Sequence, residues 1–291
     1  MTLYHIYGLA LASDLDCPEL TELTPDDVAA RGHDTVALRA AQAPLSLPEG
    51  RQIEQRVWIT PDAILYELAG HARILVERPD RITVELLGVT PFSAIRPFLY
   101  GTCFTALLHM RGLIPLHISA IRAPEGVLAF TGPSGAGKST RVSELHFAHG
   151  WPLICDDLAV LHPGDARPLL HAGVNQIKLW RDAVERFGID PARLTPDALR
   201  ADKFLLIDPA MFVHAPQPLE VLTWIDDGTT GWDAAKPGMA VETLLNAIFL
   251  PGLAGLFGDR AKLARDCMRF AQGLELRSYP RQAPVRAAQG A

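Results

Sequence analysis

The stretch GPSGAGKSTRVSELHFAHGWPLICDD, residues 132–157, decides the fold, because it joins a glycine-rich loop to two adjacent aspartates through one short helix. Residues 132–139 match the pattern GxxxxGK(S/T) in full, with the apolar segment VLAFT before them and a helical segment after them. In this order of strand, loop and helix, the pattern is typical of loops whose backbone amides bind phosphate oxygens. We therefore expect a nucleoside triphosphate to bind at this loop.

The residues of the loop suit phosphate binding, each for a chemical reason. Gly132, Gly135 and Gly137 let the backbone adopt conformations that other residues resist, so that its amides can face phosphate oxygens. Lys138 brings a mobile positive charge to the β and γ phosphates, and the Ser139 hydroxyl can bind Mg²⁺. The other nucleotide-binding candidates in the segment are Pro133, Ser134, Ala136 and Thr140.

The two aspartates, Asp156 and Asp157, stand between the apolar segments PLIC and LAVL. We expect the helix after the loop to end at Gly150 and a strand to start at Pro152, with the aspartates on that strand. Because side chains alternate along a strand, only one of the pair can then face the nucleotide directly. Two carboxylates in a buried strand are costly unless a cation neutralises them, and Mg²⁺ with Lys138 would do so. We therefore assign the pair a functional role rather than a place in a solvated turn.

His117 and Lys203 are further candidates whose roles the residue pattern leaves open. His117 lies in the apolar segment LHISAI, and a hairpin at residues 124–126 could place it near the loop. A lone histidine in an apolar strand is, however, more often a core residue. Lys203 stands in a polar patch before the apolar segment FLLID, where it could contact a phosphate or lie on the surface.

The apolar pattern divides the 291-residue chain into three regions. The pattern of residues 1–90 predicts short strands separated by turns, with an antiparallel meander over residues 64–87. This region contains no recognisable set of catalytic residues. Residues 91–112 have helical spacing and predict a linking helix. From residue 113 to residue 291 strands alternate with helices, which favours a layered α/β domain. Its expected strands are residues 116–123, 126–132, 152–162, 204–208, 219–227 and 274–280, and its expected helices are residues 139–150, 177–188, 241–250 and 259–273.

Composition excludes several classes of protein. The net charge is −6 and no basic stripe is present, which argues against a nucleic-acid partner. The N-terminus lacks the features of a signal peptide, and the most apolar later segment, residues 247–258, is short and broken by Pro251, so we expect no membrane association. The four dispersed cysteines predict buried thiols in a reducing compartment. We therefore expect a cytoplasmic protein. Whether it forms a homo-oligomer stays open. Its small, polar C-terminal residues 281–291 are expected to fray.

The combination LHISAI…GVLAFTGPSGAGKST…PLICDD resembles the catalytic core of the HPr kinase/phosphorylase family, whose nucleotide-binding fold is related to that of phosphoenolpyruvate carboxykinase. The resemblance is specific over residues 110–162 and looser in YHIYGLALAS, IKLWRDAVERFG and DKFLL. It is nearest to the bacterial HPr-kinase-related serine kinases, some of which phosphorylate precursor peptides in lasso-peptide gene clusters. It implies an α/β fold with an HPr-kinase-like P-loop core behind a β-rich N-terminal region.

The resemblance also implies roles for the candidate residues. It places His117 in the active site, makes Asp157 the general base, and lets Asp156 support the base or bind the metal with Ser139. The implied cofactors are ATP and Mg²⁺, and the implied partner is a peptide or protein that bears a serine hydroxyl. Which aspartate is the base stays open. So do two alternatives: a kinase of small hydroxyl compounds such as free serine, and a nucleotide-binding regulator with ATPase activity alone.

Two departures separate the chain from the bifunctional HPr kinases. The segment HAGVNQIKLWRDAV, which follows the aspartate pair, lacks the signature with a metal-binding glutamate. The N-terminal region also does not resemble the domain that precedes the core in those enzymes. We therefore expect neither phosphorolysis nor HPr itself as the substrate, and no motif in the sequence names the acceptor.

Overall fold

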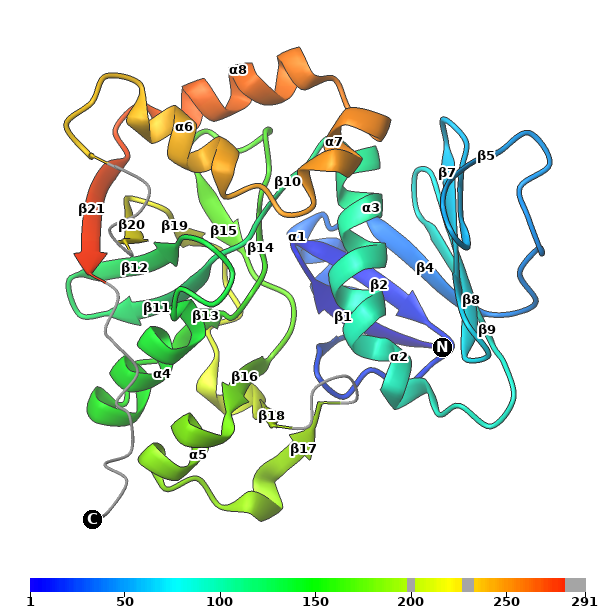
Figure 1. Cartoon of the computed structure of the whole chain (residues 1–291), viewed down its shortest axis with the longest axis horizontal. Helices are drawn as coiled ribbons and strands as arrows, with labels where there is room; N and C mark the ends of the chain where they lie inside the picture. Colours follow the sequence, from blue (N-terminus) through cyan, green and yellow to red (C-terminus); the bar gives the residue numbers. More distant parts are fainter. Residues whose placement is uncertain (198–201, 227–232, 281–291) are drawn as a thin grey trace.

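The computed structural model describes residues 1–197, 202–226 and 233–280 and has a mixed α/β fold (Figure 1). Two expectations concern residues outside these ranges: the fraying of residues 281–291, and part of the polar patch before Lys203. Within the described residues the strands form four sheets. No described helix is long and apolar enough to cross a membrane. The four cysteines are buried thiols without disulfide bonds, as predicted.

The N-terminal region forms a nine-stranded sheet with the order β3-β1-β2-β4-β9-β8-β7-β6-β5. Residues 64–87 form the predicted antiparallel meander, made of β7 (Ala63–Leu68), β8 (Ala72–Glu77) and β9 (Arg81–Leu86). The sequence pattern does not indicate the short helix α1 (Pro25–Arg31). The remaining strands are β1 (Thr2–Ile6), β2 (Leu9–Ser13), β3 (Thr21–Leu23), β4 (Thr35–Ala40), β5 (Arg51–Glu54) and β6 (Val57–Ile59).

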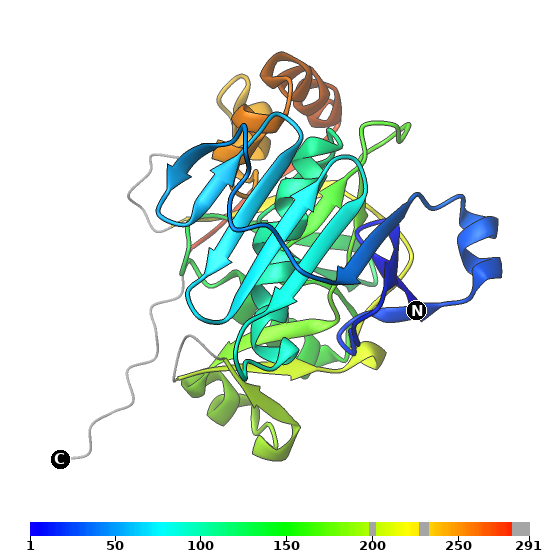
Figure 2. The ribbon, with the colours of Figure 1, turned by 90° about the vertical axis from the view of Figure 1, so that its right-hand side faces the viewer.

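The predicted helix over residues 91–112 is present, but in three parts. These are α2 (Phe92–Phe98), a π-helical turn (Leu99–Cys103) and α3 (Phe104–Met110). Pro97 lacks the amide hydrogen of a regular helical bond, and the π-helical turn begins two residues after it. All residues of α3 are buried, because this helix lies between the nine-stranded sheet and the rest of the chain (Figures 1 and 2).

The glycine loop belongs to a five-stranded sheet with the order β13-β11-β12-β20-β21. β11 (Ser119–Ala123) and β12 (Gly126–Thr131) form the predicted hairpin, and β20 (Val221–Asp226) lies parallel to β12. The helix α4 (Lys138–His149) follows the loop and ends at Gly150, as predicted. The other elements of this sheet and the later helices are β13 (Leu153–Cys155), β21 (Glu275–Pro280), α5 (Arg181–Phe187), α6 (Met239–Asn246), α7 (Pro251–Phe257) and α8 (Arg260–Ala271).

Two smaller sheets complete the fold of the described residues, with the orders β10-β14-β15-β19 and β16-β18-β17. In Figure 1, β14 and β15 of the first sheet and β16 and β18 of the second are drawn between the five-stranded sheet and the N-terminal region. The strands of the first are β10 (Ile114–Leu116), β14 (Ala159–Leu161), β15 (Leu169–His171) and β19 (Gln217–Pro218), and those of the second are β16 (Gln176–Trp180), β17 (Leu194–Pro196) and β18 (Lys203–Ile207).

The prediction of one strand over residues 152–162 is wrong. This segment contains β13 in the five-stranded sheet and β14 in another sheet, and the chain turns between them at Asp157, whose φ of 79° is left-handed. Because the aspartates lie at this turn rather than on a strand, strand alternation does not decide which of them faces the site. Two consecutive apolar segments look like one strand in a sequence, since the apolar pattern does not show which sheet each joins.

The expected strand over residues 116–123 is likewise interrupted. β10 ends before His117 and β11 begins at Ser119, while the backbone amide of His117 donates to the carbonyl oxygen of Ala247 (2.6 Å). At this interruption the chain passes from the sheet that contains β10 to the five-stranded sheet that contains β11. At Asp157 it passes back, from β13 in the five-stranded sheet to β14 in the sheet of β10. Both interruptions therefore lie where the chain crosses between the same two sheets.

The expected helix over residues 177–188 begins too early. Its first part is the strand β16, and only α5 is helical. Ile177 and Leu179 are buried with Lys178 between them, which is the two-residue period of a strand. A strand of this length is not distinguishable from a first helical turn by its apolar residues alone.

Candidate functional site

The glycine loop connects β12 to α4 with the backbone that the sequence predicts. Gly132, Gly135 and Gly137 have φ values of 139°, 79° and 105°, which side chains strongly disfavour. Lys138 is buried, and its Nζ donates to the carbonyl oxygens of Gly132 (3.0 Å) and Pro133 (3.2 Å). Its ammonium therefore already lies over the loop. Of the other loop candidates, Ala136 is buried, Pro133 and Ser134 are exposed, and Ser139 and Thr140 are half-buried.

Asp156 joins the loop helix to the neighbouring strands. Its carboxylate is buried and accepts hydrogen bonds from Ser119 Oγ (2.7 Å) and from the backbone amide of Lys178 (2.9 Å). Burial and the charge of Asp157 raise the pKa of Asp156, while hydrogen bonds from Lys178, Ser119 and the Ser139 hydroxyl partly oppose the rise. Asp156 and Ser139, the two metal-binding candidates, therefore lie beside each other.

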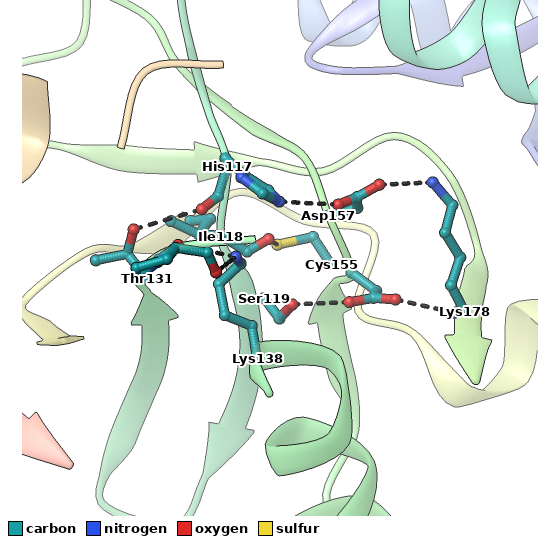
Figure 3. A network of polar contacts seen from close by, with 11 residues as sticks. His117, Ile118, Ser119, Thr131, Lys138, Cys155, Asp157 and Lys178 are labelled. Atoms are coloured by element: carbon teal, nitrogen blue, oxygen red, sulfur yellow. Dashed lines mark hydrogen bonds and ion pairs between the residues drawn. The ribbon is translucent and has the colours of Figure 1, made fainter. Parts of the chain in front are cut away.

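Asp157 lies between two cationic or potentially cationic groups (Figure 3). Its Oδ1 is 3.1 Å from His117 Nε2, and its Oδ2 is 2.5 Å from Lys178 Nζ. Burial raises the pKa of Asp157, but the hydrogen bond with His117 and the charge of Lys178 outweigh burial and hold it below its usual range. The carboxylate is thus ionised. Its side chain is 34% exposed, whereas Asp156 is 7% exposed, so Asp157 is the more accessible of the two carboxylates.

The left-handed backbone at Asp157 sets the directions of both carboxylates. A φ of 79° is uncommon outside glycine, although aspartate tolerates it better than most residues. Such conformations concentrate at functional sites, where surrounding contacts hold them in place. Here the contacts are those of Ser119 and Lys178 to Asp156 and those of His117 and Lys178 to Asp157.

His117 reaches Asp157 because the chain leaves the strand conformation at this residue. Its backbone amide binds Ala247, its carbonyl oxygen accepts from Thr131 Oγ1 (3.4 Å), and its ring lies 5.4 Å from the ring of Phe249. The backbone of His117 is therefore held at both of its polar groups, while the imidazole packs beside Phe249 and is directed at the carboxylate. The structure brings His117 to the aspartate pair, as the resemblance implies.

Lys178 is the main site residue that sequence reasoning missed. It binds both carboxylates, Asp156 through its backbone amide and Asp157 through its side chain. Burial lowers the pKa of Lys178, but the charge of Asp157, its hydrogen bond and the charge of Asp156 together outweigh burial and raise the pKa, so the ammonium stays charged. The available signal was a single lysine between the buried residues Ile177 and Leu179. Ser119 was missed as well, because a serine within an apolar strand carries no specific signal.

Lys203, the remaining candidate, lies on β18 opposite Trp180, and its Nζ is 5.3 Å from the centre of the Trp180 ring. Lys203 is also close enough to Lys138 for its charge to contribute, after burial, to a lowered pKa of Lys138. Lys203 and Lys178 are on the same face of the paired strands β16 and β18, because Lys178 pairs with Leu205 two residues from Lys203. Lys138 and Lys178 thus lie near the two carboxylates, and Lys203 lies near Lys138.

The donor atoms at the site suit Mg²⁺ delivered with a nucleotide. Asp156, Asp157 and Ser139 provide hard oxygen ligands of the kind that Mg²⁺ prefers. Among residues 1–197, 202–226 and 233–280, no group of three or more His, Cys, Asp or Glu side chains could hold a metal ion by itself. Mg²⁺ is commonly bound by one or two carboxylates together with substrate phosphates, and the donor set fits that arrangement.

The N-terminal region holds the strand that carries Lys178. The amide of Tyr7 donates to the carbonyl oxygen of Ala172 (2.9 Å), and the amide of Asn175 donates to that of Glu19 (2.8 Å). Gly173 packs so closely on Tyr7 that a Cβ there would lie 2.7 Å from the ring. Burial, and next the charge of Asp157, raise the pKa of Tyr7, so this region extends to the site itself. No sequence motif indicated this role.

Comparisons with known proteins do not assign the chain to a family. No family model matches the chain, and no curated protein matches it. Among solved structures, the HPr(Ser) kinase/phosphatase from Coxiella burnetii is similar over 42% of this chain and 66% of its own, with 14% sequence identity and a TM-score of 0.21. A similarity of this size says nothing about activity, so the function has to be inferred from the residues of the site.

The ion pair between Lys178 and Asp157 gives a first prediction. Replacement in Lys178→Met leaves a half-buried carboxylate without its ammonium, and we expect a loss of about 1–3 kcal/mol in the free energy of unfolding at neutral pH. The loss should shrink as the pH falls below about 4, the ordinary pKa of an aspartate, because the carboxyl that has lost Lys178 then becomes protonated and no longer needs the cation. Denaturant unfolding at several pH values measures both effects.

A matched control is Lys262→Met, which removes an exposed lysine paired with Asp266 (2.8 Å) on α8. An exposed pair of this kind contributes little, so the control should change stability by less than about 0.5 kcal/mol. Equal losses in the two variants would show that the contact between Lys178 and Asp157 has no special energetic role.

Proposed function

We propose that the chain is an ATP-dependent phosphotransferase that moves the γ-phosphoryl group to a serine hydroxyl of a peptide or protein. The observation that carries the proposal is that Lys138, Ser139 and the carboxylates of Asp156 and Asp157 lie close enough for their charges and hydrogen bonds to interact. Figure 3 shows Lys138 beside the contacts of the aspartates with Ser119, His117 and Lys178. Phosphoryl transfer through a loose transition state requires mainly positioning and charge neutralisation. The network contains groups for both tasks.

The loop and Lys138 would bind the phosphates. Lys138 Nζ now donates to two neutral carbonyl oxygens, those of Gly132 and Pro133. Phosphate oxygens are charged acceptors and form the stronger bond with an ammonium, so a nucleotide can replace these partners without leaving the lysine buried and unpaired. The amides at the N-terminus of α4 add further donors.

Asp156 and Ser139 would hold Mg²⁺ together with the nucleotide phosphates. The ion neutralises charge that develops on the phosphate oxygens during transfer. The raised pKa of Asp156 shows that its resting charge is only partly compensated, and a cation would lower that pKa. Burial of Asp156 keeps it on the nucleotide side, away from an acceptor.

Asp157 would orient the acceptor hydroxyl and accept its proton. It is the more exposed of the two carboxylates and is held by His117 and Lys178. Its low pKa makes it a weak base at rest, but a loose transition state requires little proton transfer before the phosphoryl group has moved. When Lys178 turns to the transferring phosphoryl group, the pKa of Asp157 rises and the carboxylate becomes a better proton acceptor.

The test of the reaction class uses γ-labelled ATP with three acceptor conditions: serine-containing peptides, free serine, and no acceptor. Label in a peptide supports the proposal. Label in free serine alone would identify a small-molecule kinase. Release of inorganic phosphate under all three conditions, without labelled acceptor, would identify a nucleotide-binding regulator with ATPase activity.

Nucleotide binding should depend on Lys138. The variant Lys138→Ala loses the cation of the loop, and we expect its affinity for Mg²⁺-ATP to fall by about 10- to 100-fold. Isothermal titration calorimetry measures the change, with Lys262→Ala on the exposed face of α8 as a control that keeps normal affinity. Unchanged binding in Lys138→Ala would refute the assignment of the loop.

Replacement of Asp157 should slow phosphoryl transfer without weakening ATP binding. The variant Asp157→Asn should keep its affinity for ATP while phosphoryl transfer falls by about 10²-fold or more, because the carboxylate that accepts the proton is lost. Asp156→Asn should instead weaken Mg²⁺-dependent nucleotide binding. Comparison of kcat and of ATP affinity in the two variants decides the roles, and the opposite pattern would mean that they are exchanged.

The reaction should run in one direction. Residues 171–180, which contain Lys178 and run beside the aspartate pair, include no carboxylate that could take the part of the missing glutamate. Purified phosphorylated acceptor incubated with the protein, Mg²⁺ and excess inorganic phosphate should therefore release no pyrophosphate. Pyrophosphate formed at a rate close to that of the forward reaction would contradict this expectation.

A further inference from the structure

A cavity of about 120 Å³ lies between α2 and the sheet β16-β18-β17, at the junction of the N-terminal region with the rest of the chain. Its apolar walls include Ala94 and Pro97 from α2 and Leu205 and Ile207 from β18. Ser93, Ala94, Thr195 and Pro196 are exposed and form its rim, while Glu19, Tyr100 and Gln176 are buried and form its floor. The cavity therefore opens to solvent on one side and is closed on the other.

The cavity lies on the same sheet face as Lys178. Lys178 pairs with Leu205, and Leu205 pairs with Thr195, so all three side chains point to one side of the three strands. Gln176 stands two residues before Lys178 on β16 and faces the same way. One strand spacing of about 4.8 Å thus separates the backbone that carries Lys178 from the backbone that lines the cavity. Lys178, which binds Asp157, thus belongs to a strand that also lines the cavity through Gln176.

The floor contains a polar group that lacks a protein partner. Gln176 is 7% exposed as a residue and lines the cavity, and no hydrogen bond ties its amide to another residue of the described part of the chain. Its neighbour Glu19, in contrast, accepts bonds from Arg96 (2.8 Å) and Tyr100 (3.2 Å). Gln176 is not among the side chains whose unpaired polar atoms are sealed from solvent, so its amide is accessible from the cavity and free to bind a group that enters it. A side-chain amide offers one acceptor and two donors, which match the groups of a peptide bond.

We propose that this cavity is the subsite for an aliphatic side chain of the acceptor peptide, within about three residues of the phosphorylated serine, with Gln176 bound to the peptide backbone. The inference rests on the proposed function and adds a sequence preference to it. A cavity of about 150 Å³ accommodates benzene, so the smaller volume here suits leucine, isoleucine or valine rather than phenylalanine. The N-terminal region, through α2, would then take part in the choice of substrate.

The experiment measures steady-state phosphorylation of serine peptides in which each of the three positions before and after the serine is in turn Leu, Ala, Phe or Asp. Leucine at one position should lower KM by roughly 10-fold or more relative to alanine, since the subsite buries about three more carbon atoms. The variant Ala94→Trp fills the cavity from its exposed rim and should abolish that preference without a change in kcat or in ATP affinity. The matched control is Ala30→Trp, an exposed alanine on α1.

A second variant, Gln176→Met, keeps the size of the side chain and removes the amide. It should raise KM about three- to tenfold for all peptides, whatever the flanking side chain, because the bond it removes is to the peptide backbone. Two outcomes would overturn the subsite and leave the proposed function intact. One is an equal effect of Ala94→Trp and Ala30→Trp on peptide phosphorylation, and the other is the absence of a preference at every tested peptide position. Label in free serine alone would refute the peptide acceptor, and the subsite with it.

Discussion

The closeness of two adjacent carboxylates, one buried and one half-buried, is the constraint on which the rest of the site depends. Asp156 and Asp157 repel each other and lose hydration, which is tolerable only where every oxygen has a donor. Ser119 and the Lys178 amide bind Asp156, while His117 and the Lys178 ammonium bind Asp157. For these donors to converge, the chain has to leave the strand conformation twice, before β11 and after β13. Both interruptions are therefore structural requirements of the buried pair.

The N-terminal sheet is part of the same arrangement, because it fixes the start of β16. Tyr7 and Asn175 join the two regions through backbone hydrogen bonds, and the Asn175 side chain donates to Thr21 Oγ1 (3.0 Å). The apolar core of the N-terminal region also includes Leu158 and Val160, which directly follow the aspartate pair. The segment that carries the carboxylates and the strand that carries Lys178 are thus both anchored in the N-terminal region, which has no catalytic motif of its own.

The parts of the fold that the sequence predicted are those that local residues determine. The glycine loop, the end of α4 at Gly150 and the antiparallel meander depend on residues within a few positions of each other. The parts that it missed depend on contacts between distant segments. The direction of His117 depends on Ala247, and the strand conformation of residues 176–180 depends on its pairing with β18. Lys178 was missed for the same reason. Its side chain reaches Asp157 because it lies on a strand, and the apolar pattern predicted a helix there.

The two aspartates have different surroundings, which shift their pKa values in opposite directions. Burial and the neighbouring charge raise the pKa of Asp156, whereas His117 and Lys178 lower that of Asp157. Carboxyl groups whose environments shift their pKa values in opposite directions commonly divide the work of a site. Under the proposed function, the buried Asp156 suits a metal ion and the exposed Asp157 suits the acceptor. Lys178 pairs with Asp157 at rest, so under the same proposal the base would be weak until a phosphoryl group competes for the lysine. That competition would couple the reactivity of Asp157 to the presence of the nucleotide.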